Sequence, residues 1–520
     1  MVTLLIFVFP LVLVTLKIGG GTEILLETLK SPYTWSLFSF TFLQAALSAV
    51  ISVFLAIPFA SFFSKYRFPG RRLTLALADT AFVLPSIIVV LGFVIWYGNS
   101  GLLNTLLSEL TDGRVQLSVL YSYRAVILAH VYLNFPLSFS LLTAGMIAAG
   151  DREETAASFL GASPFRIFFT VTLPKIKGTV YQTLLLVFLF CFPSFLIVMT
   201  LGGSPKYYTV EAEIYRRAYM DGDLSSSSSL ALVSFLIMTV ILLLTGIGRK
   251  EKKIQKTHRI LKKAKGGKKV LAFLLEFLVA IFMLPPLLSI VYRAFFTKDG
   301  EFTLKAWEKL FERGDTTALN AVIVSVLIAL FSSLIATAMA TALAVSSVRR
   351  KRKFTTLLSS LPLAIGSVTL GLGFSYLSSL FYSGGRILSV ILTLLAHITV
   401  VLPFAIRSIL PGAGKLSERL LYSSLSLSPS YWRNYRKVEV PLLRSYRRKA
   451  FGFSFALSLG ETNATMALGI GNITTLPILI YKKIQHYDYQ GASALCLILL
   501  IISLIIFAFS ERGGERSVIS

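Results

Sequence analysis

Among the polar residues inside otherwise apolar stretches of this 520-residue chain, five bear most directly on the chemistry that the chain can perform. They are His130, His397, Ser194, Glu461 and Asn463. Ionisable groups among apolar residues are costly, so they usually face a cavity or the interior of a helical bundle. Glu461 could therefore balance a positively charged solute or cap an interrupted helix. The two histidines could contact a solute, or each could be satisfied by a neighbouring carbonyl group.

The sequence contains no group of residues suited to covalent catalysis. It has no GxxxxGK[ST] phosphate-binding loop, so any ATP must be bound by another chain. No Cys or His residues have the spacing of metal ligands, and Cys191 and Cys496 both lie within apolar segments. We therefore predict that this chain is not an enzyme and has no catalytic residue, no metal site and no cofactor of its own.

Apolar segments long enough to cross a bilayer recur along the whole chain. Hydrophobic residues make up 55% of it, charged residues 15%, and the mean hydropathy is +0.74. About 20 apolar residues in a helix cross a hydrocarbon core of ~30 Å. Twelve segments meet this condition: 1–18, 38–63, 73–97, 121–145, 178–201, 228–248, 270–293, 319–346, 355–381, 387–409, 449–470 and 490–510. The sequence predicts an all-α, polytopic membrane helical bundle of about twelve transmembrane helices. The first segment lacks a basic n-region and a small-x-small cleavage site, which favours a retained helix over a signal peptide.

The net charge of +26 is explained by membrane topology and does not require a nucleic-acid partner. If the N-terminus is inside, the loops on the inner side carry 36 of the 51 Lys and Arg residues, and the other side carries 15. Positive residues concentrate on the cytoplasmic side of membrane proteins. We therefore expect both termini in the cytoplasm, a cell-membrane location, and contact with anionic lipid headgroups rather than nucleic acid.

The chain also repeats itself. "LAHVYLNFP" (128–136) and "LAHITVVLP" (395–403) lie 267 positions apart, and the same offset relates Pro174 to Pro441. An even number of spans between the copies gives them the same orientation, so the repeat is parallel, and its interface is the usual place for a pathway. The predicted organisation is a first half at 1–248, a basic cytoplasmic linker at 249–269 and a second half at 270–520.

One segment between two spans of the first half contains several residues that typically start or end helices. Asp151 can act as a helix N-cap, with Glu154 completing a capping box. Gly161 suits the left-handed position that ends this helix, Ser163-Pro164 starts another, and Pro174 is expected to end it. We predict a helix-turn-helix on the cytoplasmic face. Its aromatic residues exceed what a solvated loop needs, which favours a partner surface.

These motifs resemble a known family. Ala156-Ala157, Gly161–Pro164 and Leu173-Pro174 look like the EAA loop of binding-protein-dependent ABC importer permeases, and "FPGRR" (68–72) and "LGETNAT" (459–465) agree with it. The resemblance covers nearly the whole chain and is strongest to the fused thiamine and ferric-iron permeases. It implies a type I ABC importer permease fold, in which the EAA loops (here 151–174 and 418–441) contact the ATPase. The implied coupling residues are Glu154, Ala156, Ala157, Gly161, Pro174, Ser428, Arg433 and Pro441.

The second loop departs from the family pattern more than the first. In the first loop, Thr155 stands where a glutamate is usual. In the second, Tyr422-Ser423-Ser424 replace the EAA triplet and Ser428 replaces the glycine, while Arg433 and Pro441 are retained. We therefore expect two unequal docking loops.

The resemblance implies a permease that takes up a small solute, either ferric iron or a thiamine-like molecule. An extracytoplasmic binding protein would deliver the solute, and two copies of a cytoplasmic ATPase would bind the ATP. Ser194, Glu461, Asn463, His130 and His397 are the candidate pathway residues. The alternatives are a twelve-helix secondary transporter, which would not repeat a helix-turn-helix after the fourth span of each half, and a membrane scaffold.

Overall fold

The computed structural model is almost entirely helical. It describes residues 2–18, 22–81, 84–203, 207–245, 259–310, 312, 317–349, 364–380, 385–416, 423, 426, 430–469 and 473–511. In the first half the helices are α1 (Val2–Leu16), α2 (Thr22–Lys30), α3 (Pro32–Lys65), α4 (Arg71–Ala81), α5 (Ser86–Tyr97), α6 (Leu102–Thr111), α7 (Tyr123–Ala148), α8 (Arg152–Phe159), α9 (Pro164–Ile167), η1 (Phe168–Thr172), α10 (Leu173–Cys191), η2 (Val198–Gly202), α11 (Val210–Tyr215), η4 (Arg216–Met220) and α12 (Leu224–Thr245).

The remaining helices belong to the second half. They are α13 (Gly267–Phe295), α14 (Lys305–Leu310), α15 (Thr317–Arg349), α17 (Ser367–Leu380), α18 (Arg386–Ala413), α20 (Tyr431–Asn434), η6 (Tyr435–Glu439), α21 (Val440–Leu442), α22 (Arg444–Leu459), α23 (Asn463–Leu468), α24 (Leu476–Gln485) and α25 (Tyr489–Glu511). Two short strands, β1 (Tyr66–Arg67) and β2 (Lys262–Lys263), pair in parallel. The predicted all-α class is confirmed.

Eight helices of the described residues are long and apolar enough to cross a membrane. Seven of them coincide with the predicted segments 38–63, 121–145, 228–248, 270–293, 319–346, 387–409 and 490–510. The eighth, Ser86–Thr111, overlaps only the second part of the predicted segment 73–97, because the first part forms the separate helix α4. Of the other four, α1 has 15 residues, and α17 begins at Ser367, directly after a stretch that is mostly outside the described ranges. The predicted spans 178–201 and 449–470 are each interrupted. The multi-pass bundle is therefore observed, and the count of twelve stays a prediction.

The two interrupted spans break at equivalent positions of the repeat. α10 ends at Cys191 and α22 ends at Leu459, and the breaks that follow contain Ser194 and Glu461, which are 267 positions apart. Non-helical backbone at membrane depth is tolerated where it is buried in protein or lines a cavity. The breaks therefore place polar residues and free helix ends inside the bundle.

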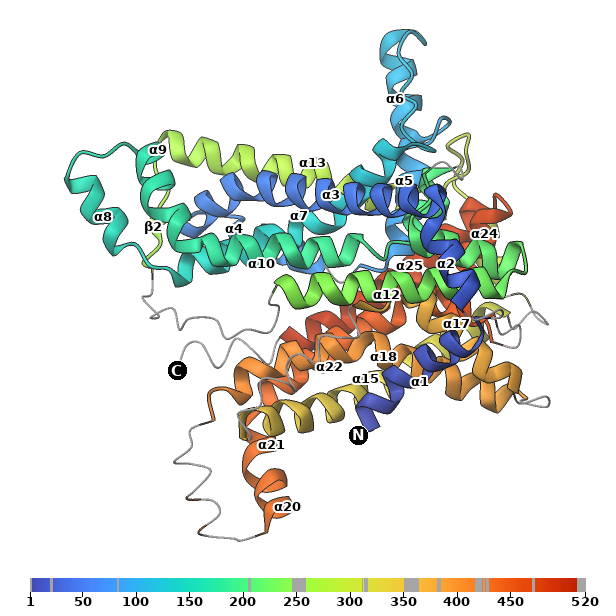
Figure 1. Cartoon of the computed structure of the whole chain (residues 1–520). Helices are drawn as coiled ribbons and strands as arrows, with labels where there is room; N and C mark the ends of the chain where they lie inside the picture. The colour runs from blue at the N-terminus through green and yellow to red at the C-terminus, as the bar shows by residue number, and fades with distance from the viewer. Residues whose placement is uncertain are drawn as a thin grey trace.

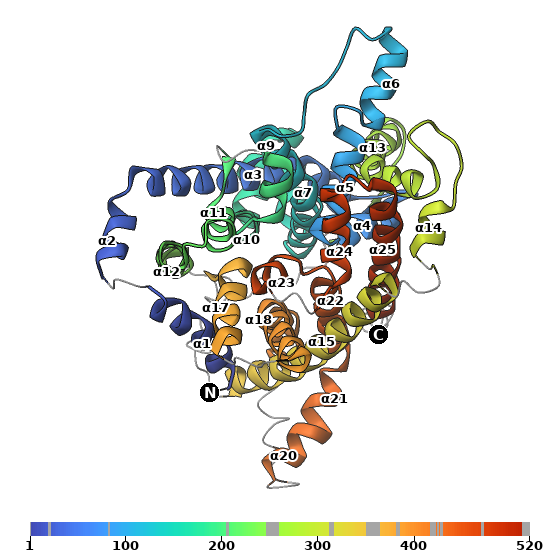
Figure 2. The same cartoon turned by 90° about the vertical axis from the view of Figure 1, so that its right-hand side faces the viewer.

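The first helix of each half packs on the other half. Figure 1 shows an upper group of helices that contains α3, α7 and α10 together with α13, and a lower group that contains α15, α18 and α22 together with α1. α1 lies against α17, and α13 lies against α5 (Figure 2). The contacts are equivalent: a Cβ atom at Gly373 would come within 2.6 Å of the Pro10 carbonyl oxygen, and one at Gly92 within 2.6 Å of that of Pro286. Both glycines thus allow one backbone to approach another.

The repeat is also visible in individual hydrogen bonds. The Thr41 hydroxyl on α3 accepts a bond of 3.0 Å from the backbone N–H of Val210. The Ser325 hydroxyl on α15 accepts one of 2.7 Å from the backbone N–H of Leu476. In both halves a long helix therefore satisfies the first free N–H group of a short helix near the opposite end of the bundle from the basic loops.

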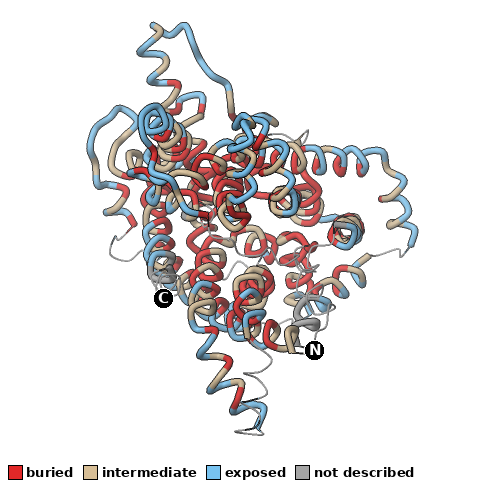
Figure 3. Tube along the Cα trace, turned by 90° about the vertical axis from the view of Figure 1, so that its left-hand side faces the viewer, coloured by how far each residue is buried: buried red, intermediate tan, exposed pale blue. Residues whose placement is uncertain are grey.

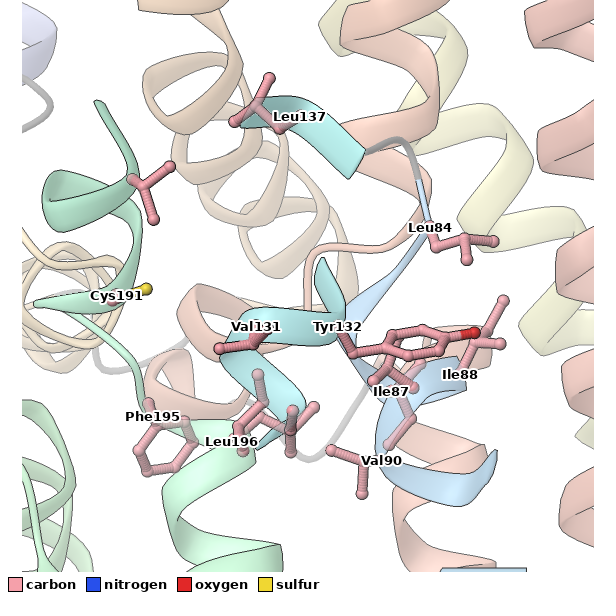
Figure 4. Close-up of a cluster of buried hydrophobic side chains, with 14 of the residues drawn as sticks. Leu84, Ile87, Ile88, Val90, Val131, Tyr132, Leu137, Cys191, Phe195 and Leu196 are labelled. Carbon is pink, nitrogen blue, oxygen red and sulfur yellow. The ribbon is translucent and has the colours of Figure 1, made fainter. Parts of the chain in front are cut away.

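Burial is highest where the helices face one another, and large apolar side chains remain exposed around the outside (Figure 3). Phe54 on α3 is 73% exposed and Phe273 on α13 is 70% exposed. An apolar periphery of this kind suits contact with lipid chains. Inside, Val131 and Tyr132 of α7 gather with Ile87 and Ile88 of α5 (Figure 4), and the Tyr132 hydroxyl donates a hydrogen bond of 2.7 Å to the Met283 carbonyl oxygen of α13.

Candidate coupling surface and translocation pathway

The segment at 151–174 forms the predicted helix-turn-helix. Gly161 follows Leu160, the C-cap residue of the first helix, and has φ +80°, so the predicted left-handed termination is confirmed. The Ser163 hydroxyl accepts a hydrogen bond of 3.3 Å from the backbone N–H of Arg166, as expected of an N-cap. The predicted capping box is wrong: Asp151 stands at the N-cap position without a side-chain cap bond, and Glu154 is engaged elsewhere.

The prediction that the second helix ends before Pro174 is also wrong. The chain remains helical from Pro164 to Cys191, through α9, the π-helical turn η1 and α10. At the junction, the backbone N–H of Leu173 bonds to the Phe168 carbonyl oxygen, five residues back. This wider turn accommodates the missing N–H of Pro174, which lies exposed in the first turn of α10. One continuous helical unit therefore joins α9 to the membrane segment.

Glu154 connects the first helix of this loop to three other parts of the chain. Its carboxylate lies 3.4 Å from the Lys65 Nζ at the end of α3, and it forms an ion pair with Arg259. It also accepts a hydrogen bond of 2.8 Å from the Thr172 hydroxyl. Burial raises the pKa of Glu154, but the charges of Lys65 and Arg259 outweigh it and leave the pKa below its ordinary value. α8 is thus fixed by charge, because no residue of this helix is buried.

The second loop contains the same type of ion pair with the acid in a different position. Glu439, whose side chain is fully buried, pairs with Arg349 at the end of α15. Arg349 corresponds to Lys65, since α15 and α3 make equivalent contacts at an offset of 284. Glu439 corresponds to Thr172, because η6 and η1 are π-helical turns 267 positions apart. The cations Lys65 and Arg349 therefore occupy equivalent positions in the two halves. The acid lies on the first helix of the first loop but on the second helical segment of the second loop.

The other predicted residues of the second loop are only partly described. Ser428 lies outside the described residues. Arg433 on α20 and Pro441 on α21 are both exposed. Figure 1 shows α8 and α9 projecting from the left-hand side of the bundle, and α20 and α21 at its lower left.

An exposed apolar patch covers the tip of the first loop. It consists of Phe159 and Leu160, each 87% exposed, with Phe165 at 75% and Phe169 at 49%. The rings of Phe165 and Phe169 lie 4.6 Å apart, centroid to centroid. Ala156 is also exposed and Ala157 is half-buried. Because these side chains project away from the bundle, they do not belong to its lipid-facing belt, and they suit the surface of another protein.

The described end of the linker is attached to this loop and is not freely solvated. Arg259 is only 2% exposed at its side chain, and its guanidinium also donates a hydrogen bond of 3.4 Å to the Ser64 hydroxyl. β2 then pairs with β1, directly after α3. This part of the predicted basic linker is therefore docked on the loop, where Glu154 compensates the buried charge of Arg259.

A cavity of about 260 Å³ lies between the two halves. Three of the five predicted pathway residues line it: His130, Ser194 and Asn463. The Asn463 Oδ1 is buried without a hydrogen-bond partner. Glu461 and His397 are not among the lining residues. The cavity is close to the lower end of the size range of small-molecule pockets.

Both histidines bond to hydroxyl groups, where the sequence suggested carbonyl groups. The His130 Nε2 lies 2.8 Å from the Ser194 Oγ. The His397 Nδ1 lies 2.8 Å from the Ser458 Oγ, and its Nε2 lies 2.9 Å from the Thr465 Oγ1. His397 is therefore satisfied inside the second half, while His130 and its partner Ser194 together face the cavity.

Two carboxylates cap helices whose first turns adjoin the cavity. The Glu461 Oε1 accepts a hydrogen bond of 2.9 Å from the Ala464 N–H at the start of α23. Glu211 of the first half accepts bonds of 3.1 and 3.3 Å from the Val368 and Thr369 N–H groups at the start of α17, in the second half. The sequence analysis missed Glu211; the available signal was an acid inside a repeated motif, where the second copy carries Pro477.

Comparison with known proteins matches this architecture to transport permeases. Residues 38–250 match the family described as binding-protein-dependent transport system inner membrane component. The thiamine transport system permease protein ThiP of Brucella abortus is 27% identical over 507 residues, which is 95% of this chain and 90% of that protein. Residues 38–250 belong to the family of binding-protein-dependent ABC importer permeases, and the similarity to ThiP extends over nearly the whole chain. ThiP of Haemophilus influenzae is 28% identical, over 92% of the permease and 88% of that protein.

A third relative transports a different class of solute by name. A Salmonella typhimurium protein named for 2-aminoethylphosphonate transport is 30% identical, but over only 169 residues, 32% of the permease and 63% of that protein. Family membership identifies this chain as a multi-pass membrane transport permease rather than an enzyme, and it replaces the secondary-transporter alternative.

Proposed function

We propose that the permease imports thiamine, received from an extracytoplasmic binding protein and driven by two copies of a cytoplasmic ATPase. The observation that carries this proposal is the similarity to thiamine permeases over nearly the whole of both chains. In this proposal both termini and the linker are cytoplasmic, as the distribution of positive residues favours. ATP is bound by the ATPase, and the cavity between the halves is part of the pathway.

The chemistry of the cavity supports a cationic solute. A free helix N-terminus attracts anions, but Glu211 occupies the N-terminus of α17 and Glu461 occupies that of α23. None of the described residues that line the cavity is positively charged. Phe190, Phe195 and Phe404 line it instead, and aromatic faces attract cations. These features favour the positively charged thiamine over a phosphonate; ferric iron is disfavoured because the described residues contain no cluster of three or more possible metal ligands.

The coupling surface supports transmission of force from the ATPase. The apolar patch of Phe159, Leu160, Phe165 and Phe169 is the proposed contact, with Ala156 and Gly161 allowing close approach. Because α9, η1 and α10 are continuous, a displacement of the patch moves the segment that carries Ser194. The ion pairs of Glu154 and Glu439 hold the first loop against the end of α3 and the second against the end of α15, so each loop and that helix move together.

Uptake by a reconstituted system tests this function. The permease, its ATPase and its binding protein are placed in proteoliposomes, and ATP-dependent accumulation of labelled thiamine is measured. We expect unlabelled thiamine to compete, and 2-aminoethylphosphonate and ferric ion not to compete. ATP-dependent uptake of either of those solutes without uptake of thiamine would overturn the proposed substrate. Accumulation that needs no ATP would overturn the proposed energy coupling.

A further inference from the structure

A long apolar groove on the outside of the bundle has one charged residue at its end. The groove has a volume of about 570 Å³ and lies between α3, α7 and α13, which run side by side in Figure 1. Its walls are aliphatic and aromatic, and among the described residues that line it only Arg124 is charged. Because α13 belongs to the second half and α3 and α7 to the first, the groove follows a contact between the halves.

The length of the groove matches one leaflet of a bilayer. On α7 its lining runs from Tyr123 to Phe135. Twelve residues of helix at 1.5 Å each extend about 18 Å, and half of a hydrocarbon core of ~30 Å is about 15 Å. The inner end is closed by aromatic rings: Phe135 lies 5.3 Å from Phe59 and 6.0 Å from Phe282, centroid to centroid. A chain that enters beside Arg124 would therefore end near the middle of the membrane.

Arg124 is suitably placed for a lipid phosphate. It is exposed at the start of α7, and no described residue forms an ion pair with its guanidinium. A guanidinium at the membrane interface can form paired hydrogen bonds to phosphate, and Tyr123 beside it is typical of the same depth. With the topology proposed above, this end of α7 lies at the outer leaflet.

We propose that the groove is a binding site for one acyl chain of an outer-leaflet phospholipid, whose phosphate is held by Arg124. The bound acyl chain fills the space between α13 and the first half, so it stabilises the packing of α13 on the first half. An anionic lipid such as phosphatidylglycerol is preferred over phosphatidylcholine, because the choline group adds a positive charge beside Arg124. The site differs from the pathway, since the two share no lining residue.

The experiment uses the delipidated full-length permease in detergent, with dioleoyl phosphatidylglycerol and dioleoyl phosphatidylcholine as probes. Retained lipids are counted by native mass spectrometry, and the unfolding temperature is measured with and without lipid. We expect one phosphatidylglycerol per chain to survive delipidation conditions that remove the rest. Arg124→Gln should weaken that binding by about tenfold, roughly the loss of one charge-assisted pair of hydrogen bonds, and should abolish the preference over phosphatidylcholine.

A second variant tests the groove itself. Leu128→Trp on α7 should fill the groove, abolish retention of the lipid and leave an unfolding temperature that no longer responds to it. Leu43→Trp is the matched control, since Leu43 is 58% exposed to the membrane on α3 outside the groove, and it should behave like the wild type. Free phosphate and the soluble headgroup should have no effect. Equal lipid retention by Leu128→Trp and the wild type, or equal loss in Leu43→Trp, would overturn the proposal; neither result would bear on thiamine uptake.

Discussion

Moving the acid of the first coupling loop to the position that it has in the second loop tests how the loop is held. Glu154→Leu removes the carboxylate from Lys65 and leaves Arg259, 2% exposed, without an anion. Breaking a buried pair costs on the order of 3–5 kcal/mol. We expect about 3 kcal/mol, because 11% of the Glu154 side chain and 26% of that of Lys65 remain exposed. At 1.4 kcal/mol for each factor of ten, the docked position of α8 should be disfavoured by about 100-fold.

The second loop suggests the compensating change. The Thr172 Oγ1 lies 2.8 Å from the Glu154 Oε1, and Glu439 occupies the equivalent position beside Arg349. Thr172→Glu in the Glu154→Leu background should therefore return a carboxylate to the same two cations. ATPase co-purification and thiamine uptake should fall by at least tenfold in the single variant and recover to within about threefold of wild type in the double variant.

Thr172→Gln in the same background is the control, since glutamine has the size of glutamate without the charge. It should not restore either activity. Recovery with glutamine equal to that with glutamate would mean that side-chain size holds the loop and that the ion pair does not. Normal ATPase binding by Glu154→Leu alone would refute the positioning role altogether.

Three further predictions concern other parts of the permease. Gly161→Val should reduce ATPase co-purification and uptake at least tenfold, because a β-branched residue at φ +80° costs about 1–2 kcal/mol. Gly178→Val is the control: this glycine is helical and its surroundings are equally open, so the variant should transport nearly normally. Burial raises the pKa of Glu213, but its partners Arg216 and Arg217 lower it by more, so the pKa lies below its ordinary value. Its contribution to the free energy of unfolding is therefore complete above the ordinary pKa of ~4.5 and decreases as the pH falls below it. The stability difference between Glu213→Gln and the wild type should persist from pH 7 to 5 and shrink progressively below pH ~4.5, and its loss already at pH 6 would contradict this. Asn463→Leu should raise the KM for thiamine about tenfold without lowering the unfolding temperature, because the buried Asn463 Oδ1 has no hydrogen-bond partner to lose. A fall in the unfolding temperature with an unchanged KM would show that Asn463 is not a pathway residue.

Local signals in the sequence predicted local structure well. Hydropathy gave the helical bundle, and the left-handed turn at Gly161 and the N-cap at Ser163 follow from the preferences of single residues. The prediction that a helix ends before Pro174 failed because it assumed α-helical hydrogen bonds, whereas the chain forms a π-helical turn before this proline. Such a turn has no clear signature in one sequence.

Interactions between distant residues were harder to predict. The spacing of Asp151 and Glu154 fits a capping box, but two cations from residues 65 and 259 attract the carboxylate more strongly than one backbone N–H group does. The position of the acid at Glu439 could have been predicted by comparing where charged residues lie in the two halves of the repeat, instead of comparing only the motif residues. Glu211 could not be assigned a partner, because its contact with α17 depends on how the halves meet.

The packing of the first helix of each half on the other half has a consequence for synthesis at the ribosome. α13 emerges when α5, its neighbour, has already been made, but α1 must wait for α17, whose Gly373 lies roughly 360 residues after Pro10. At about 5–20 residues per second, this delay is roughly 20 to 70 seconds. During that time α1 has only lipid, or an insertion chaperone, beside the face that will contact the second half. α1 therefore reaches its neighbour in the second half only late in synthesis, and a chain shortened before α17 would leave α1 without that contact.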